Sequence, residues 1–434
     1  MRLPDGLNGD SALASRRAFL AWSTGVMASF CGLSVFGGSM DKGSTTVILG
    51  GGFGGIATAR NLRKALPPEH RILLVSRTSS FQMGTTKTWV MLGEAEPEKV
   101  TRPLDVLSSH GIEVLLAEVQ RIEPSKMEIT TSDGVLRPDY VVIALGAELD
   151  MAAVPGLAEA GETFYTRDGA VRLRSILQDF AGGKIVLVIP RIPFQCPPGP
   201  YEAAMMLRSY LRARGLAQKS SIEIHTVEKS PMATAGPAIG KYITDSLGER
   251  GIGFHPQCQV QSVDGAGRAV VLADGTRISY DLLIAIPPHA SPRVVRESGL
   301  TNAAGWVPAD PKTLEMTDTP RANRIFAIGD VTSVPLPGRF NPDMPLVLPK
   351  AGIFAERQAS VVASRIASHV LDREVGTAFD GKGFCYIEVG DGQAMRGDGS
   401  FFDMPHPTMT PRSPDGVQLA EKKAWVDSWM STYL

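Results

Sequence analysis

Residues 190 to 202, PRIPFQCPPGPYE, place a thiol where a nucleotide-binding turn would carry glycines. They follow an apolar run typical of a buried strand at residues 184–189, and precede a helical pattern over residues 201–214 and a further strand at 222–227. Such a unit cradles phosphates when glycines let the backbone come close. This turn instead contains prolines, which have no N–H to donate. We predict that it does not bind a nicotinamide dinucleotide and that it offers the sulfur of Cys196.

The chain of 434 residues has only four cysteines, so it is no disulfide scaffold, and any bridge would be a single one with a special role. Besides Cys196 these are Cys31 in the N-terminal segment, Cys258 and Cys385. Cys258, in GIGFHPQCQVQSV, is predicted to lie on an ordinary strand as a small buried residue. Cys385, in GKGFCYIEVGDGQA, is predicted to begin a short strand late in the chain.

A glycine fingerprint near the N-terminus predicts a dinucleotide site. In TTVILGGGFGGIATARNLRKAL (residues 45–66), the pattern G-x-G-x-x-G lies between a strand and a helix and is filled by Gly50, Gly52 and Gly55. The first glycine permits a tight turn, the second lets the backbone approach a pyrophosphate, and the third lets helix and strand pack closely. The amino terminus of the helix then favours the phosphate charge.

The strand that follows, HRILLVSRT, ends in Ser76 and Arg77, where an NAD-binding domain usually has an acidic residue for the ribose. Serine can still form a hydrogen bond, and arginine can lie beside the adenosine or a phosphate. This departure argues against NAD at the first turn and is compatible with FAD.

Two later motifs indicate whether the cofactor is a nicotinamide dinucleotide or a flavin. RPDYVVIALGAELD places a strand before Ala144 and Gly146, and RIFAIGDVTSVP places another before Gly329 and Asp330. Together with the glycine fingerprint, these A-x-G and GD motifs resemble the two-dinucleotide-domain flavoproteins of the disulfide-reductase superfamily. The resemblance implies FAD as the cofactor, with Asp330 hydrogen-bonded to its ribityl and pyrophosphate region.

The motif that begins at Cys196, CPPGPYE, resembles the sulfide-oxidising flavoproteins of that superfamily: the flavoprotein subunit of flavocytochrome c sulfide dehydrogenase and the sulfide:quinone oxidoreductases. PPHASPRVV and LPKAG also resemble their motifs, and the resemblance covers essentially everything after residue 43. It implies that Cys196 lies on the reactive face of the flavin and pairs with a late cysteine, for which Cys385 is favoured over Cys258. Hydrogen sulfide, as hydrosulfide, would attack this disulfide and leave a persulfide on Cys196, or on its partner if the roles are swapped. Sulfur would leave as elemental sulfur or polysulfide.

Three further residues are candidates for the site. The resemblance implies that Lys350 lies near the flavin ring, where its charge would stabilise the anionic reduced form. Glu202, near the start of a helix, is a candidate for proton transfer or for a carboxylate that stabilises the helix terminus, and both interpretations stay open. His289, after two prolines at a strand end, is a candidate proton shuttle near neutral pH, although a structural role is favoured for it.

Departures from both groups leave the electron acceptor open. The region SSFQMGTTKTWVML lacks the cysteine that tethers FAD in the flavocytochrome c subunit, so we predict noncovalent FAD. GAELDMAAVPG lacks a third cysteine that some sulfide:quinone oxidoreductases carry. A cytochrome c subunit is the first expectation and a membrane quinone the second. An NADH:acceptor oxidoreductase and a non-catalytic flavin-binding subunit are the remaining alternatives.

Both ends of the chain bear on its location. SRRAFL followed by an uncharged apolar run predicts a twin-arginine signal and a periplasmic protein, the alternative being an uncleaved membrane anchor. In the tail, Trp425, Trp429 and Tyr433 recur at i, i+4 and i+8 and form one aromatic face of a helix. That face either touches a membrane interface or packs on the chain's own body or a partner subunit, and packing is favoured.

These elements predict an α/β fold with two Rossmann-like dinucleotide-binding-type domains and a small C-terminal region. The expected divisions are a signal at 1–40, an FAD-binding domain at 41–150 and 281–370, a second Rossmann-like domain without its glycines at 151–280, and a strand and helix region at 371–434. The charge balance, 44 Lys and Arg against 45 Asp and Glu, argues against nucleic acid as a partner. No metal site is predicted.

Overall fold

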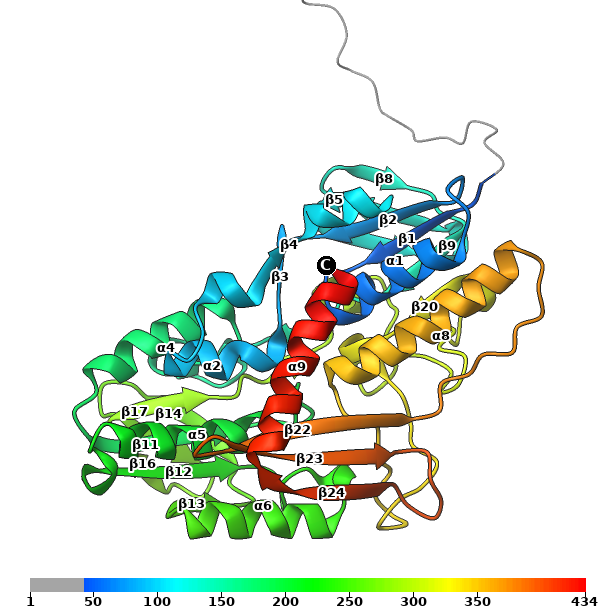
Figure 1. The fold of residues 1–434 in the computed structure, drawn as a ribbon. Helices are drawn as coiled ribbons and strands as arrows, with labels where there is room; N and C mark the ends of the chain where they lie inside the picture. Colours follow the sequence, from blue (N-terminus) through cyan, green and yellow to red (C-terminus); the bar gives the residue numbers. More distant parts are fainter. Residues whose placement is uncertain (1–42) are drawn as a thin grey trace, which may run out of the picture. The chain divides into compact units, whose positions relative to one another are not determined.

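The computed structural model describes residues 43–434, and this part of the chain has the predicted α/β fold (Figure 1). The predicted twin-arginine signal and Cys31 lie outside the described residues. Among the residues that the structure describes, no helix combines the length and the apolar character that a membrane span needs. The predicted domain boundaries remain predictions.

Five parallel strands form the first sheet, in the order β20-β9-β1-β2-β5. Their bounds are β1 Thr45–Leu49, β2 Arg71–Ser76, β5 Glu113–Leu116, β9 Tyr140–Ile143 and β20 Ile325–Ala327. Strands β1, β9 and β20 are almost entirely buried, which explains their continuous apolar sequences. Helix α1 (Phe53–Ala65) covers β1 and β2 and packs along α8 (Gly352–Val370).

Four parallel strands form the second sheet, in the order β13-β12-β11-β17. Their bounds are β11 Gly183–Ile189, β12 Ser220–Thr226, β13 Ile252–His255 and β17 Leu282–Ala285. Helix α5 (Gly199–Ala213) connects β11 to β12, and α6 (Pro237–Glu249) connects β12 to β13. The predicted strand, turn, helix and strand are confirmed, although the helix begins at Gly199, earlier than expected.

Smaller elements join the two sheets. The antiparallel ribbons are β3 Ser80–Gln82 with β4 Thr101–Pro103, β6 Val119–Glu123 with β7 Glu128–Thr131 and β8 Gly134–Leu136, β10 Glu148–Leu149 with β18 His289–Ala290, and β14 Val260–Asp264 with β15 Ala269–Leu272 and β16 Arg277–Ser279. The parallel pair is β19 Val307–Pro308 with β21 Thr332–Ser333. The other α-helices outside the C-terminal region are α2 Lys87–Leu92, α3 Leu157–Ala160, α4 Arg167–Asp179 and α7 Arg293–Glu297.

The C-terminal region is an antiparallel sheet followed by one long helix. Its strands are β22 Lys382–Gly390, β23 Gln393–Ser400 and β24 Thr408–Asp415, and the helix is α9 Gly416–Tyr433, red in Figure 1. Helix α9 contacts β22, β23 and α1, and β22 contacts α5. This region therefore packs residues from the end of the chain against α1, a helix of the first sheet, and against α5, a helix of the second sheet.

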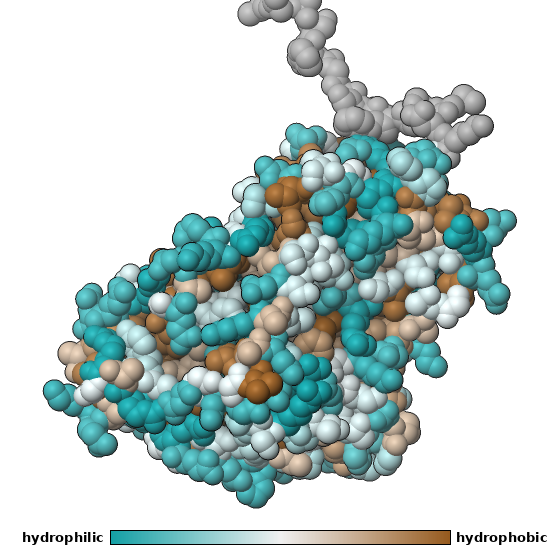
Figure 2. All heavy atoms as spheres, in the orientation of Figure 1, coloured by the Kyte–Doolittle hydropathy of each residue, from teal (hydrophilic) through white to brown (hydrophobic). Residues whose placement is uncertain are grey.

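The aromatic face of α9 packs on the chain's own body, as favoured. Trp429 and Tyr433 are buried, and the Trp429 ring lies 4.7 Å from the ring of Phe53 and 4.9 Å from that of Phe81, centre to centre. The alternative of a membrane-facing surface is wrong for these two residues, because their apolar area is already removed from water. On the face shown in Figure 2, which α9 crosses, apolar side chains form small separate patches among hydrophilic ones.

Candidate active site

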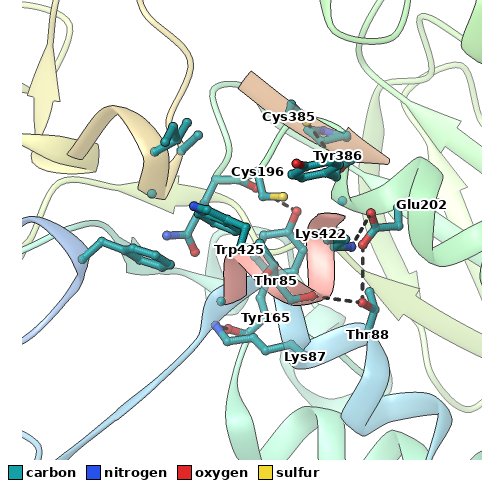
Figure 3. A pocket seen from close by; sticks show the side chains of 18 of the residues that line it. Thr85, Lys87, Thr88, Tyr165, Cys196, Glu202, Cys385, Tyr386, Lys422 and Trp425 are labelled. Carbon is teal, nitrogen blue, oxygen red and sulfur yellow. Dashed lines mark hydrogen bonds and ion pairs between the residues drawn. The ribbon is translucent and has the colours of Figure 1, made fainter. Parts of the chain in front are cut away.

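One cavity in the described part of the chain brings together both cysteines predicted to react (Figure 3). Cys196 comes from the turn after β11 and Cys385 from β22, and both are free thiols. We call this space the thiol cavity. Cys258 does not line it: this residue lies in the loop before β14, not on a strand as expected, with its Sγ 3.7 Å from Nδ1 of His225. Cys385 and not Cys258 is thus the cysteine that shares a cavity with Cys196.

Cys196 has an unusual backbone conformation. Its φ is 56°, in the left-handed region that costs a non-glycine residue about 1–3 kcal/mol. Its N–H donates to the carbonyl oxygen of Lys350 at 2.8 Å, and its carbonyl accepts from the N–H of Gly199 at 2.8 Å. These two hydrogen bonds hold the strained turn, so the position of the sulfur is fixed by the backbone on both sides.

Burial keeps both thiols protonated. It raises the pKa of Cys196 to about 12, and the nearby carboxylate of Glu202 adds to this effect. It also raises the pKa of Cys385 well above its usual range, with Cys196 and Glu202 as further causes. A nearby cation is therefore needed to make either sulfur a thiolate near neutral pH.

Two carboxylates and one ammonium form a buried network beside the cysteines. Nζ of Lys422 lies 3.0 Å from Oε2 of Glu202 and 2.7 Å from Oε1 of Glu388. Nε1 of Trp89 donates to Oε1 of Glu388 at 2.5 Å, and the Glu388 N–H donates to Oε2 of Glu202 at 2.9 Å. Burial raises the pKa of Glu202, although its attraction to Lys422 opposes the shift. Glu202 is thus a buried carboxylate inside the site, and its role in proton transfer stays a prediction.

Sequence reasoning missed Lys422 and Glu388. Lys422 lies one helical turn before Val426 and on the same face of α9 as Trp429 and Tyr433, all of them buried. This helical spacing was the sequence signal available for Lys422, because a lysine on the apolar face of a helix needs a partner inside the protein. Glu388 lies on β22 among apolar residues, and its position offers no comparable local signal.

Lys87, the first residue of α2, is a second cation at the thiol cavity that sequence reasoning missed. Its Nζ donates to the carbonyl oxygen of Tyr165 at 2.5 Å. Burial lowers the pKa of Lys87 to about 8, and its electrostatic interactions with Cys196 and Asp330 oppose the shift. The available signal was a single lysine in the otherwise uncharged stretch MGTTKTWVML. At neutral pH this ammonium is charged and can stabilise a thiolate beside it.

The first glycine turn fits the pyrophosphate of FAD. Gly50 has a φ of 114°, and a Cβ there would lie 2.3 Å from the carbonyl oxygen of Ala144. A Cβ on Gly55 would lie 1.8 Å from the carbonyl oxygen of Gly50. Gly52 caps α1 and has nothing within 4 Å of an added Cβ, so the helix terminus is open to a phosphate. Phe53, the next residue, lines the thiol cavity, so the turn lies beside the cysteines.

The other residues expected around the dinucleotide differ in how freely they can bind. Ser76 is buried, and its Oγ donates to a carbonyl of its own loop at 2.8 Å, so its single proton is already used. Arg77 is exposed just after β2. The Ala144 N–H donates to a carbonyl of β1 at 2.8 Å, and Gly146 has a φ of 69° with open space where a Cβ would lie. Ala144 thus helps to hold the turn, while Gly146 leaves space for a ligand beside it.

A second hollow is lined by Gly329, Asp330 and Lys350. Asp330 is buried and accepts a hydrogen bond from Nε2 of Gln195 at 2.7 Å. Nζ of Lys350 donates to the carbonyl oxygen of Asp330 at 2.6 Å and lies 3.3 Å from the ring centre of Trp306. Burial lowers the pKa of Lys350 to about 8. Lys350 lines this hollow and not the thiol cavity, which Lys87 and Lys422 line instead.

His289 does not suit proton exchange near neutral pH. Its Nδ1 lies 2.6 Å from the carbonyl oxygen of Pro287, and its Nε2 is buried with no partner in the described part of the chain. Burial lowers the pKa of His289 to about 4, so the ring is neutral at pH 7. The structural interpretation is the one that this environment favours.

The acidic residue beside the second Rossmann-like turn is already hydrogen-bonded within the chain. Tyr201, fully buried in α5, donates its hydroxyl to the carboxylate of Glu228, which also accepts from Oγ1 of Thr226 at 3.2 Å. Glu228 follows β12, where a dinucleotide-binding domain carries the acid that binds the ribose. That carboxylate is already paired, which agrees with the predicted loss of nicotinamide binding.

The comparisons with known proteins agree with this geometry. Residues 44–189 match the family described as "Pyridine nucleotide-disulphide oxidoreductase", and residues 170–287 match "Sulfide dehydrogenase [flavocytochrome c] flavoprotein chain, central". The chain is 28% identical over 378 residues to the sulfide-quinone reductase of Aquifex aeolicus, which covers 84% of each chain. It is 26% identical over 308 residues to the mitochondrial sulfide:quinone oxidoreductase of Mus musculus, covering 67% of this chain and 66% of that one.

The fold is also that of a solved structure. The sulfide:quinone oxidoreductase from Aquifex aeolicus superposes with a TM-score of 0.80 at 24% identity, over 90% of this chain and 91% of that chain.

Proposed function

The chain belongs to the sulfide-oxidising flavoproteins of the disulfide-reductase superfamily, and we propose that it passes electrons from sulfide, through FAD, to a cytochrome c partner. The observation that carries the sulfide half is that Cys196 and Cys385, from distant parts of the chain, line one cavity beside the dinucleotide turn. The match of residues 170–287 to a flavocytochrome c flavoprotein chain supports the cytochrome half.

The two cysteines would react as a disulfide that hydrosulfide opens. When hydrosulfide attacks one sulfur, the S–S bond breaks, the attacked cysteine becomes a persulfide, and the other cysteine leaves as a thiolate. We assign the attack to Cys196. FAD, when bound, supplies the two-electron acceptor for this sulfur pair.

The surrounding side chains would stabilise the negative charge on sulfur, accept the released proton and hold the cofactor. Lys422 is positioned to stabilise the Cys385 thiolate, because its charge opposes the effect of burial on the pKa of Cys385. Lys87 is positioned to stabilise negative charge on the sulfurs at Cys196. Glu202, whose pKa burial raises, would accept the proton released by the attacking sulfur. Gly52 and the amino terminus of α1 would hold the pyrophosphate, and Asp330 would accept hydrogen bonds from the ribityl chain.

The charge of Lys87 predicts a pH dependence. Because its pKa is lowered to about 8, the ammonium is present below that pH and lost above it. We expect the rate of flavin reduction, expressed per hydrosulfide, to fall as the pH rises through about 8. In Lys87→Met the rate of flavin reduction should be lower, and it should no longer fall as the pH rises through about 8. Lys229→Met, a change at an exposed lysine, should keep the wild-type pH profile. An unchanged pH profile in Lys87→Met would remove Lys87 from the mechanism.

The proposed function is tested by mixing the purified holoprotein anaerobically with sulfide or with NADH and following the flavin absorbance. We expect rapid bleaching by sulfide and none by NADH, because Tyr201 already occupies the carboxylate of Glu228. Bleaching by NADH alone would show that the second Rossmann-like turn binds a nicotinamide despite its prolines. No bleaching by either would favour a non-catalytic flavin-binding subunit.

A membrane quinone is the second candidate acceptor, because one wall of the thiol cavity is aromatic. Phe384 and Trp425 line it with their ring centres 5.7 Å apart at 83°, a surface suited to a flat apolar ring. After reduction by sulfide, the protein can be mixed with cytochrome c or with a soluble quinone analogue. Faster reoxidation by the cytochrome supports the first candidate, and faster reoxidation by the quinone replaces it with the second.

We also propose a periplasmic location from the twin-arginine signal. Cell fractionation of a strain with Arg16→Lys and Arg17→Lys should leave the protein in the cytoplasm, while the wild type is recovered from the periplasm. Recovery of both in one compartment would contradict this location.

A further inference from the structure

The edge of the second sheet carries a side-chain cluster that the sulfide chemistry does not use. Glu223 and His225 lie on β12, and His255 lies on the edge strand β13, directly paired with His225. One possible ligand atom from each of the three residues lies within 4.8 Å of the other two. None of them lines the thiol cavity.

Both imidazoles direct the same nitrogen at one carboxylate oxygen. Nε2 of His225 lies 3.0 Å, and Nε2 of His255 lies 3.9 Å, from Oε2 of Glu223. The two rings stack nearly parallel, with their centres 4.3 Å apart and 9° between their planes. A tetrahedral zinc ion with bonds of about 2.0–2.1 Å separates its ligands by about 3.3 Å, so the exposed His255 ring would have to turn out of the stack to direct its nitrogen at the same ion.

The charge states also suit a cation. A neutral imidazole has one N–H and one lone pair, so His225 would bind the ion through Nε2 in the tautomer that carries its proton on Nδ1. The carboxylate of Glu223 already faces a cation, the ammonium of Lys184 at 2.8 Å. Half-buried Glu223 is therefore a carboxylate that attracts positive charge.

A lysine competes for the same oxygen. Nζ of Lys184 lies 2.8 Å from Oε2 of Glu223, and 30% of the lysine side chain is exposed. A metal ion would have to displace this ammonium, which can swing into solvent on its flexible stem. The competition gives the site a property that simple packing of two histidines would lack: removing Lys184 should improve metal binding.

We propose that Glu223, His225 and His255 bind one divalent transition-metal ion, with zinc as the first candidate. Two imidazoles and one carboxylate are a ligand set that favours zinc over calcium or magnesium. His255 is exposed, so the fourth position is open to water. The ion would join the edge strand β13 to β12.

The test is equilibrium dialysis of the tag-free holoprotein against zinc chloride, followed by metal analysis. We expect one zinc per chain, at least about 10-fold weaker binding in His255→Ala, and several-fold tighter binding in Lys184→Met. His110→Ala, which removes an exposed histidine elsewhere, should bind as the wild type does. The flavin absorbance of each variant reports that it has folded.

Copper(II) gives a second, independent readout through electron paramagnetic resonance, since oxidised flavin is silent. The wild-type spectrum should show hyperfine structure from two nitrogens and His255→Ala from one. Equal zinc binding by the wild type and His255→Ala, or weaker binding by Lys184→Met, would overturn the proposal. Absence of zinc from the wild type after dialysis would do the same.

Discussion

Replacing Cys385 with serine is expected to slow sulfide-dependent flavin reduction by on the order of 10³-fold or more, a loss typical of removing a reacting nucleophile. Cys196→Ser should show a loss of the same order, because a disulfide needs both sulfurs and either variant leaves none to be opened. The double variant should be no slower than either single variant, since the two residues act as a unit. Stopped-flow absorbance under anaerobic conditions measures all three rates.

Cys258→Ser is the matched control. It replaces a thiol by the same hydroxyl at a cysteine outside the thiol cavity, so its rate should stay within about twofold of the wild type. If Cys258→Ser lost the reaction and Cys385→Ser kept it, the pairing proposed here would be wrong. If Cys196→Ser alone lost it, Cys385 would be a neighbour of the reacting sulfur and not its partner.

Local sequence predicted the parts of this site that local geometry controls. The glycine turn, the strands before Ala144 and Gly329, and the proline turn at Cys196 are each set by residues adjacent in the chain. A turn that needs a positive φ, as at Gly50, leaves its mark in the residue type. Cys385 was placed by resemblance, and the structure puts it in the same cavity as Cys196.

The parts that sequence reasoning missed are those that long-range packing creates. Lys87 and Lys422 come from opposite ends of the chain, and nothing adjacent to either reveals that both reach one cavity. Glu202 was open to two interpretations because its burial depends on β22 and α9 covering the start of α5. The cluster at Glu223 was missed because its histidines become neighbours only when β12 and β13 pair.

Lys422→Met is expected to lower the free energy of unfolding by about 3–5 kcal/mol, the usual cost of removing one partner from a buried ion pair. The cost arises because Glu202 and Glu388 would remain buried with no cation between them. Methionine keeps most of the side-chain length, so the loss reports the charge more than the volume. Denaturant unfolding of the holoprotein measures it. Lys423→Met, at the exposed neighbouring position, should change stability by less than about 0.5 kcal/mol.

The pH dependence of this loss separates a charge effect from a packing defect. Without Lys422, the pKa of Glu202 should rise further, because the attraction that now opposes the effect of burial is gone. A carboxyl whose folded pKa lies above its unfolded value binds more protons when folded, so stability falls as the pH rises through that range. The deficit of Lys422→Met should therefore shrink as the pH is lowered from about 8 to about 5. A deficit that stays constant over this range would mean that Lys422 contributes through its packing and not through its charge, and Glu202 would then lose its place as an acid–base group tuned by that lysine.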